Sequence, residues 1–146
     1  MNKKIVIICL GISIFLAAFL SHGFAYTQKF NIDSQREVEN TKYVFEKPYA
    51  YPYKEAFLST LNLLRDWNVE IYLKDFDKGI ILARAYKNWN APSDNFGLYF
   101  YKVSDQETRI VLRIAGIVNA DKIKDIAEDV LNSIEKEIQF IRKSKE

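Results

Sequence analysis

The stretch that decides the fold is residues 53–85, which read YKEAFLSTLNLLRDWNVEIYLKDFDKGIILARA. Over 53–67 the apolar residues recur at positions i, i+3, i+4 and i+7, a spacing that predicts one apolar face on a helix. The period then changes to two over 69–75, as on a half-buried strand. The sequence DFDKG at 75–79 has the composition of a tight turn, and a return strand follows it. The chain is therefore organised around a helix followed at once by a hairpin.

The remaining elements follow from the same two periods. Pro48 and Pro52 favour extended or turning chain, and Pro52 suits the first turn of the helix. Short segments with turn chemistry separate the predicted strands, so these strands form an antiparallel meander. The last helix begins near Asp121, at the positive end of the helix dipole, and has one apolar and one charged face. The predicted strands are residues 42–46, 69–75, 79–88, 96–103 and 108–117, and the predicted helices are residues 53–68 and 121–141.

These elements predict a two-layer α+β fold in the order β-α-β-β-β-β-α. An antiparallel meander sheet forms one layer, and two amphipathic helices cover one of its faces. Residues 42–146 are expected to form this single domain, because about 100 residues suffice for one core. In residues 79–88, both alternate sets of side chains are apolar. The sequence therefore does not decide which set of this strand, that is which parity, faces the helices. If the strand is buried on both faces, a second layer or a partner must cover the sheet.

The first 25 residues have the order of a secretory signal peptide. The first residues are positive, residues 5–20 carry no charge, and Gly23 and Ala25 stand at positions −3 and −1 of a cleavage site. Cleavage predicts an exported protein, in the periplasm first and outside the cell as the alternative. If the segment is not cleaved, it anchors the protein in a membrane. Residues 26–41 are polar, without a sustained period, and are expected to form a flexible leader.

Cleavage also changes the chemistry that the chain can perform. Cys9, His22 and Met1 are the only cysteine, histidine and methionine, and all three precede the cleavage site. The remaining chain cannot form a disulfide, a Cys/His zinc site or a triad with histidine. Of 21 lysines and arginines, 2 are removed, and the remaining 19 balance 19 aspartates and glutamates, which argues against nucleic acid as a partner. We therefore expect a protein that is not an enzyme and has no cofactor.

A metal site is not predicted either. Asp75, Asp77 and Asp94 supply oxygen atoms, but they lack the spacing of an EF-hand loop. Asp75 and Asp77 fit a hairpin turn, in which Gly79 supplies a positive φ.

The candidate partner-binding residues lie on the sheet face that points away from the helices. If the aliphatic residues of the strands face the helices, then the residues that face away are Tyr72, Tyr99, Tyr101, Arg109 and Arg113. Tyrosine and arginine together on a flat surface are enriched in protein interfaces. The alternative is an ordinary solvated face that cross-strand pairs stabilise.

Two aromatic loops form a second candidate site. Tyr49 and Tyr51 lie beside the prolines before the first helix, and Trp89 lies in the loop after the hairpin. In loops, such side chains can line the mouth of a ligand site. The alternative is that they close the ends of a small core.

The hairpin also carries a resemblance. Residues 69–75, V-E-I-Y-L-K-D, and residues 77–83, D-K-G-I-I-L-A, follow the helix in the same order as in small exported bacterial envelope proteins. The chain resembles domains of the lipoprotein component of the outer-membrane β-barrel assembly machine, and several uncharacterised periplasmic families. The resemblance implies a helix packed on an antiparallel sheet and a place in the cell envelope. It implies no catalytic residue.

The sequence thus leads to two functional expectations. The first is a non-enzymatic exported domain that contacts another envelope protein through the outer sheet face. The second is a carrier that holds a small apolar or lipid ligand between sheet and helices, in the helix-grip manner. The aromatic content of the two loops motivates the second expectation.

Overall fold

The computed structural model describes residues 33–84, 95–116 and 120–144. The chain divides into two compact units, residues 1–33 and residues 34–146, and the strands and helices named below belong to the second. The predicted signal peptide, Trp89 and Asp94 lie outside the described residues. Within the described ranges, no helix is both long enough and apolar enough to cross a membrane.

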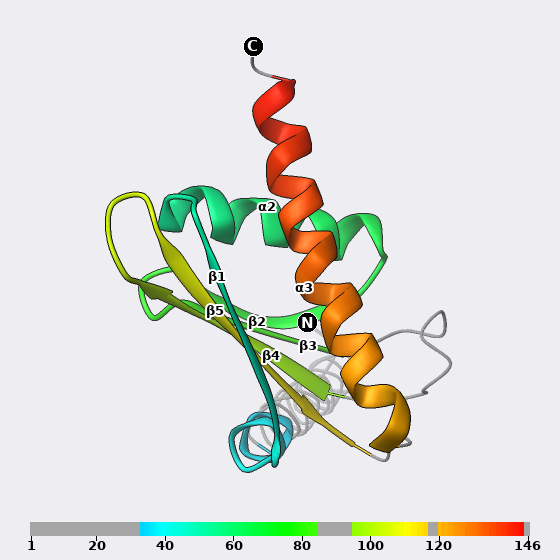
Figure 1. The fold of residues 1–146 in the computed structure, drawn as a ribbon. Helices are drawn as coiled ribbons and strands as arrows, with labels where there is room; N and C mark the ends of the chain where they lie inside the picture. Colours follow the sequence, from blue (N-terminus) through cyan, green and yellow to red (C-terminus); the bar gives the residue numbers. More distant parts are fainter. Residues whose placement is uncertain (1–32, 85–94, 117–119, 145–146) are drawn as a thin grey trace, which may run out of the picture. The chain divides into compact units, whose positions relative to one another are not determined.

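From residue 43 on, the described elements follow one another in the predicted order (Figure 1). The strands are β1 (Tyr43–Tyr49), β2 (Glu70–Asp75), β3 (Ile80–Arg84), β4 (Asn95–Lys102) and β5 (Thr108–Ala115), and the two long helices are α2 (Tyr53–Asp66) and α3 (Ala120–Lys143). The strands form one antiparallel sheet in the order β1-β5-β4-β3-β2. This confirms the predicted α+β class and the order β-α-β-β-β-β-α.

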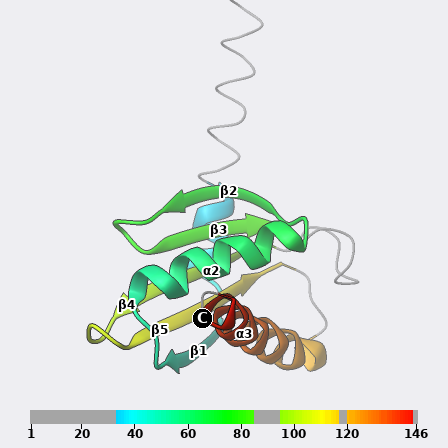
Figure 2. The same cartoon turned by 90° about the horizontal axis from the view of Figure 1, so that it is seen from above.

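Helices α2 and α3 cover one face of the sheet, which we call the inner face (Figure 2). Their apolar residues recur at three- and four-residue spacing, so one stripe of each helix points at the strands. Phe57 and Leu64 of α2 and Ile134 and Ile138 of α3 are at most 2% exposed, and they pack in one cluster with Leu98 of β4. Each such side chain stabilises the fold by roughly 2 kcal/mol through burial.

The end of α2 sets the direction of β2. Asn68 adopts a φ of 55°, and its amide donates a hydrogen bond to the carbonyl of Arg65. The amide of Val69 donates to the carbonyl of Leu64 at 3.0 Å. These bonds satisfy carbonyl groups that a helix end leaves free, and asparagine tolerates the left-handed conformation that they need. The helix therefore stops where the sequence predicts, near Asn68, and β2 begins two residues later.

The opposite face of the sheet, which we call the outer face, has a layer of its own. Residues 33–39 are helical, and Val38 is fully buried in a small cluster with Leu82 of β3 and Ala115 of β5. The sequence predicts a flexible leader here, because only Ser34 and Val38 of this stretch are buried and two residues give no visible period. This layer explains why β3 is apolar in both registers: Ile81 faces α2 and α3, and Leu82 faces Val38.

A β-bulge changes the faces of β2. The pairing between β2 and β3 shifts between Ile71 and Leu73, which leaves Tyr72 as an extra residue on the edge strand. Ile71 packs on the inner cluster, whereas both Tyr72 and Leu73 pack on the outer one. Simple alternation predicts Leu73 on the inner face, and the extra residue moves it to the outer face.

Candidate functional site

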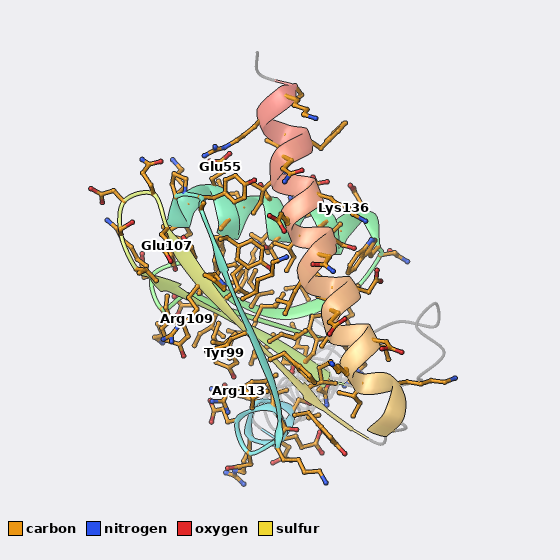
Figure 3. All side chains as sticks on the ribbon, in the orientation of Figure 1. Glu55, Tyr99, Glu107, Arg109, Arg113 and Lys136 are labelled. Carbon is orange, nitrogen blue, oxygen red and sulfur yellow. The ribbon has the colours of Figure 1, made fainter. Side chains whose placement is uncertain are left out.

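Four of the five predicted partner-binding residues form two tyrosine–arginine pairs on the outer face, and Figure 3 labels Tyr99, Arg109 and Arg113 among them. The guanidinium of Arg109 lies 5.1 Å from the ring centre of Tyr101, and that of Arg113 lies 5.5 Å from the ring centre of Tyr99. The register explains both contacts, because Arg109 stands directly opposite Tyr101, while Arg113 is diagonal to Tyr99. The two arginines thus cover the rings of the neighbouring strand.

The helical segment 34–39 divides this surface into two parts. Arg113 donates from Nη1 to the carbonyl of Glu39 at 2.7 Å, so it holds the end of that segment. The hydroxyl oxygens of Tyr72 and Tyr99 are buried and have no hydrogen-bond partner among the described residues. Tyr101, by contrast, is 45% exposed. Three of the five predicted residues therefore serve the contact with segment 34–39, and only Tyr101 and Arg109 form an open surface.

The phenols beneath this segment stay protonated. Burial raises the pKa of Tyr72 to about 12; Arg84 acts against this increase, and Tyr99 and Glu37 add to it. Burial also raises the pKa of Tyr99, with a further contribution from the Glu39 carboxylate. Both side chains are therefore neutral hydrogen-bonding groups at physiological pH.

Tyr49 and Tyr51, the predicted mouth residues, close the domain between β1 and the helices. Tyr49 is 2% exposed, and its hydroxyl donates to the carbonyl of Leu131 at 2.8 Å. The guanidinium of Arg142 lies over the ring of Tyr51, 4.6 Å from the centre of that ring. Arg142 also donates to both carboxylate oxygens of Glu55, at 2.7 and 2.9 Å, which joins the end of α3 to the start of α2. The two tyrosines thus seal one end of the inner layer.

Four aromatic rings gather where α2 begins. Tyr53 and Phe57 of α2, Phe76 of the β2–β3 turn and Phe100 of β4 lie with ring centres 4.9 to 6.5 Å apart, and we call them the aromatic cluster. The Tyr53 hydroxyl also donates to the carbonyl of Phe76. Phe76 remains 42% exposed, so the cluster runs from the core to the surface.

Sequence reasoning missed the aromatic cluster. The motif Asp75-Phe76-Asp77 predicts a tight turn, and this prediction gives its central phenylalanine no role. A large apolar residue between two acids in a tight turn was the signal, because such a turn needs no phenylalanine. As for metals, the described residues contain no group of three carboxylate, histidine or cysteine side chains that could hold an ion.

Solved structures show what this fold is similar to. The di-domain ARO/CYC StfQ from the steffimycin biosynthetic pathway matches 70% of this chain with a TM-score of 0.57, at 10% identity. The fold is shared with StfQ. The chain spans 46% of the length of that di-domain protein. TTHA0849 from Thermus thermophilus (11% identity, 67% of this chain and 97% of the other, TM-score 0.45) and the Zhui aromatase/cyclase from Streptomyces sp. R1128 (10%, 67% and 86%, 0.33) resemble it more loosely.

Comparison of the sequence with known protein families and curated proteins does not assign this chain to a family. No protein-family model matches the chain. No curated protein matches it either. The resemblance to envelope proteins and the predicted export therefore stay predictions.

The match to StfQ corrects one expectation. The sequence analysis predicted a protein that is not an enzyme, since histidine and cysteine are absent after residue 25. That prediction is wrong, because an aromatase/cyclase is built on the same fold. The missing residue types exclude particular catalytic groups, and they do not exclude catalysis by carboxylate, lysine or tyrosine.

Proposed function

We propose that this protein binds a small, neutral, apolar ligand between the inner face of the sheet and helices α2 and α3. The observation that carries the proposal is the arrangement shared with StfQ, in which 70% of this chain takes part. A 24-residue helix, α3, lies on an antiparallel sheet beside a second helix, α2. This arrangement supports the carrier that the sequence analysis gave as its second expectation.

The chemistry of the inner layer indicates the class of ligand. Among the described residues, no aspartate, glutamate, lysine or arginine is buried. Two hydroxyls that are buried in this layer are already engaged: Thr60 donates to the carbonyl of Ala56 at 2.8 Å, and Tyr49 donates to that of Leu131. A charged ligand would meet no counter-charge here, and the loss of its hydration would oppose binding. The layer therefore favours an uncharged molecule with few polar atoms.

The aromatic cluster is where we place the first contact with the ligand. Phe76 and Tyr53 are accessible from the surface, while Phe57 and Phe100 belong to the core. Phe76 lies on a turn, so its ring can move without disturbing a strand. Aromatic faces also favour flat apolar ligands through offset stacking and edge contacts.

The test uses the neutral fluorophore N-phenyl-1-naphthylamine and the full-length protein. We expect saturable binding of one probe per chain. Phe76→Ala should weaken it at least about fivefold, because one ring of the contact is lost. Phe140→Ala is the matched control: Phe140 is 68% exposed, lies near the end of α3, and takes no part in the aromatic cluster. Non-saturable fluorescence, or an equal loss in both variants, would refute the proposal.

Conversion of the bound ligand is a second candidate, which the match to StfQ favours. Such a reaction would draw on carboxylate, lysine or tyrosine groups at the rim of the inner layer. Lys47 is one of them, since its Nζ lies 2.7 Å from a carboxylate oxygen of Glu135 between β1 and α3. A ligand that co-purifies with the protein and changes mass on incubation, but not with Lys47→Met, would support this candidate. A constant mass would oppose it.

A further inference from the structure

The two edges of the sheet differ in how well they are protected against pairing. Strands β1 and β2 lie at opposite borders (Figure 2). The bulge between Ile71 and Leu73 interrupts β2, and such bulges protect an edge from further pairing. Strand β1 pairs with β5 over seven residues without a shift, and within the described residues it pairs with no other strand. Its second edge is therefore regular and open.

The side chains along β1 reinforce this difference. Val44 is 44% exposed on the outer face, between Lys42 and Glu46, which are exposed as well. On the inner face, Tyr43 and Phe45 pack against the core but remain partly exposed. A regular free edge with exposed apolar residues is a template for another strand.

We propose that β1 pairs antiparallel with β1 of a second copy of this chain, about a two-fold axis at Val44. The ring of Pro48 removes one backbone donor, and proline in a sheet stands where its nitrogen points away from the ladder. Val44 and Glu46, which alternate with Pro48 along β1, then direct their N–H and C=O groups to the open edge, and Lys42 directly precedes the strand. Pairing about Val44 brings each Lys42 opposite Glu46 of the other copy, and this occurs twice.

Charge selects this register over its neighbours. A two-fold axis at Phe45 would bring Lys42 opposite Pro48, and an axis at Glu46 would bring two carboxylates together. Only the axis at Val44 pairs opposite charges, and opposite charges across strands stabilise a sheet. It also brings Tyr43 opposite Phe45 of the second copy, which would bury rings that are now partly exposed.

The contact of Glu46 with Arg109 in the same chain competes only weakly with a contact to Lys42 of a second copy. A carboxylate oxygen of Glu46 lies 3.7 Å from Nη1 of Arg109, and both side chains are about half exposed or more. Exposed pairs of this kind contribute little stability. The Glu46 carboxylate is therefore available to the lysine of a second copy.

The test is the mass of the full-length protein as a function of concentration, by sedimentation equilibrium, with no ligand added. We expect a weak dimer, because a single pair of strands buries little surface. Glu46→Lys places two lysines opposite each other, and Lys42→Glu does the same with two carboxylates. Each change should raise the dissociation constant of the dimer at least about tenfold.

The double variant, Lys42→Glu with Glu46→Lys, separates the proposal from other effects of these changes. It restores opposite charges across the axis but not the contact between Glu46 and Arg109. Recovery of the dimer to within about threefold of the native dissociation constant supports the proposal. A monomer at all concentrations, a dimer indifferent to both single changes, or a double variant that does not recover would overturn it. Circular dichroism checks that each variant is folded.

Discussion

Val38 lies directly on Gly97, at a point of the sheet where no side chain fits between them. A Cβ on Gly97 would stand 2.7 Å from Cγ1 of Val38, and 2.9 Å from both Cδ2 of Leu82 and Cε2 of Tyr99. Real Cβ atoms do not come this close to other carbons, so the glycine is what lets segment 34–39 reach the outer face. The second layer of the domain thus needs a glycine at this position of β4.

Gly97→Ala should therefore destabilise the protein by about 1–3 kcal/mol, the usual cost of overpacking a core. Urea unfolding measures the loss, and hydrogen exchange should show faster exchange in residues 34–40. The double variant Gly97→Ala with Val38→Ala removes the atom that collides, so its loss should be smaller than the sum of the two single losses. Unchanged stability in Gly97→Ala would show that segment 34–39 is not held in this way.

Two tyrosine-to-phenylalanine changes should have opposite outcomes. Tyr49→Phe removes a donor from the carbonyl of Leu131 and should cost about 1 kcal/mol. Tyr72→Phe removes a buried hydroxyl that has no partner among the described residues, and it should be neutral or stabilising. Urea unfolding at neutral pH compares the two. Equal losses would mean that the Tyr72 hydroxyl makes a hydrogen bond in solution.

The same side chains predict how stability depends on alkaline pH. Burial raises the pKa of Tyr72 to about 12 from an ordinary value of 10.0, and it raises the pKa of Tyr49 as well. Above pH 10 the unfolded chain loses these protons while the folded chain keeps them. The corresponding stability is present below pH 10 and is lost as the pH rises toward 12.

Unfolding midpoints in urea at pH 8, 10 and 11 test this dependence, and Tyr72→Phe should reduce the decline. Phenolate absorbance offers a second measurement, because part of the tyrosines should ionise only well above pH 10. If every tyrosine of the folded protein titrated near pH 10, the burial of these hydroxyls would be refuted.

The junction of α2 and α3 leads to a fourth prediction. Arg142 binds both carboxylate oxygens of Glu55 and covers the ring of Tyr51, which lysine cannot do with a single ammonium group. Arg142→Lys should lower the melting temperature slightly and speed hydrogen exchange in the last turn of α3. The difference should shrink at high salt.

Lys124→Ala is the control for that change, since its contact with Glu128 is 3.8 Å long and exposed. If Arg142→Lys and Lys124→Ala behaved alike, the fork between Arg142 and Glu55 would have no structural role in solution.

The sequence alone predicts the two helices on the inner face of the sheet. It does not predict the helical segment on the outer face, and the reason is physical. Helices α2 and α3 show their apolar stripes because many of their residues face the core. Segment 34–39 buries only Ser34 and Val38, and two residues make no period. Its position also requires Gly97, whose role appears only when β4 lies under that segment.

The candidate site was partly visible for similar reasons. Alternation along β4 and β5 predicted which residues face outward, and the pairs of Tyr99 with Arg113 and Tyr101 with Arg109 follow from it. The bulge at Tyr72 could not be predicted, since no residue type in this edge strand indicates an extra position. The aromatic cluster brings together residues 47 positions apart, from Tyr53 to Phe100, and only the folded chain shows it.

The central claim is that a neutral apolar ligand binds within the inner layer. The most direct measurement is a set of nuclear Overhauser effects between bound N-phenyl-1-naphthylamine and the full-length protein labelled on its methyl and aromatic groups. We predict contacts from the probe to Phe57 and Phe100, on the inner face. Contacts confined to the surface groove at Leu58 and Ile141, or none at saturation, would contradict the account.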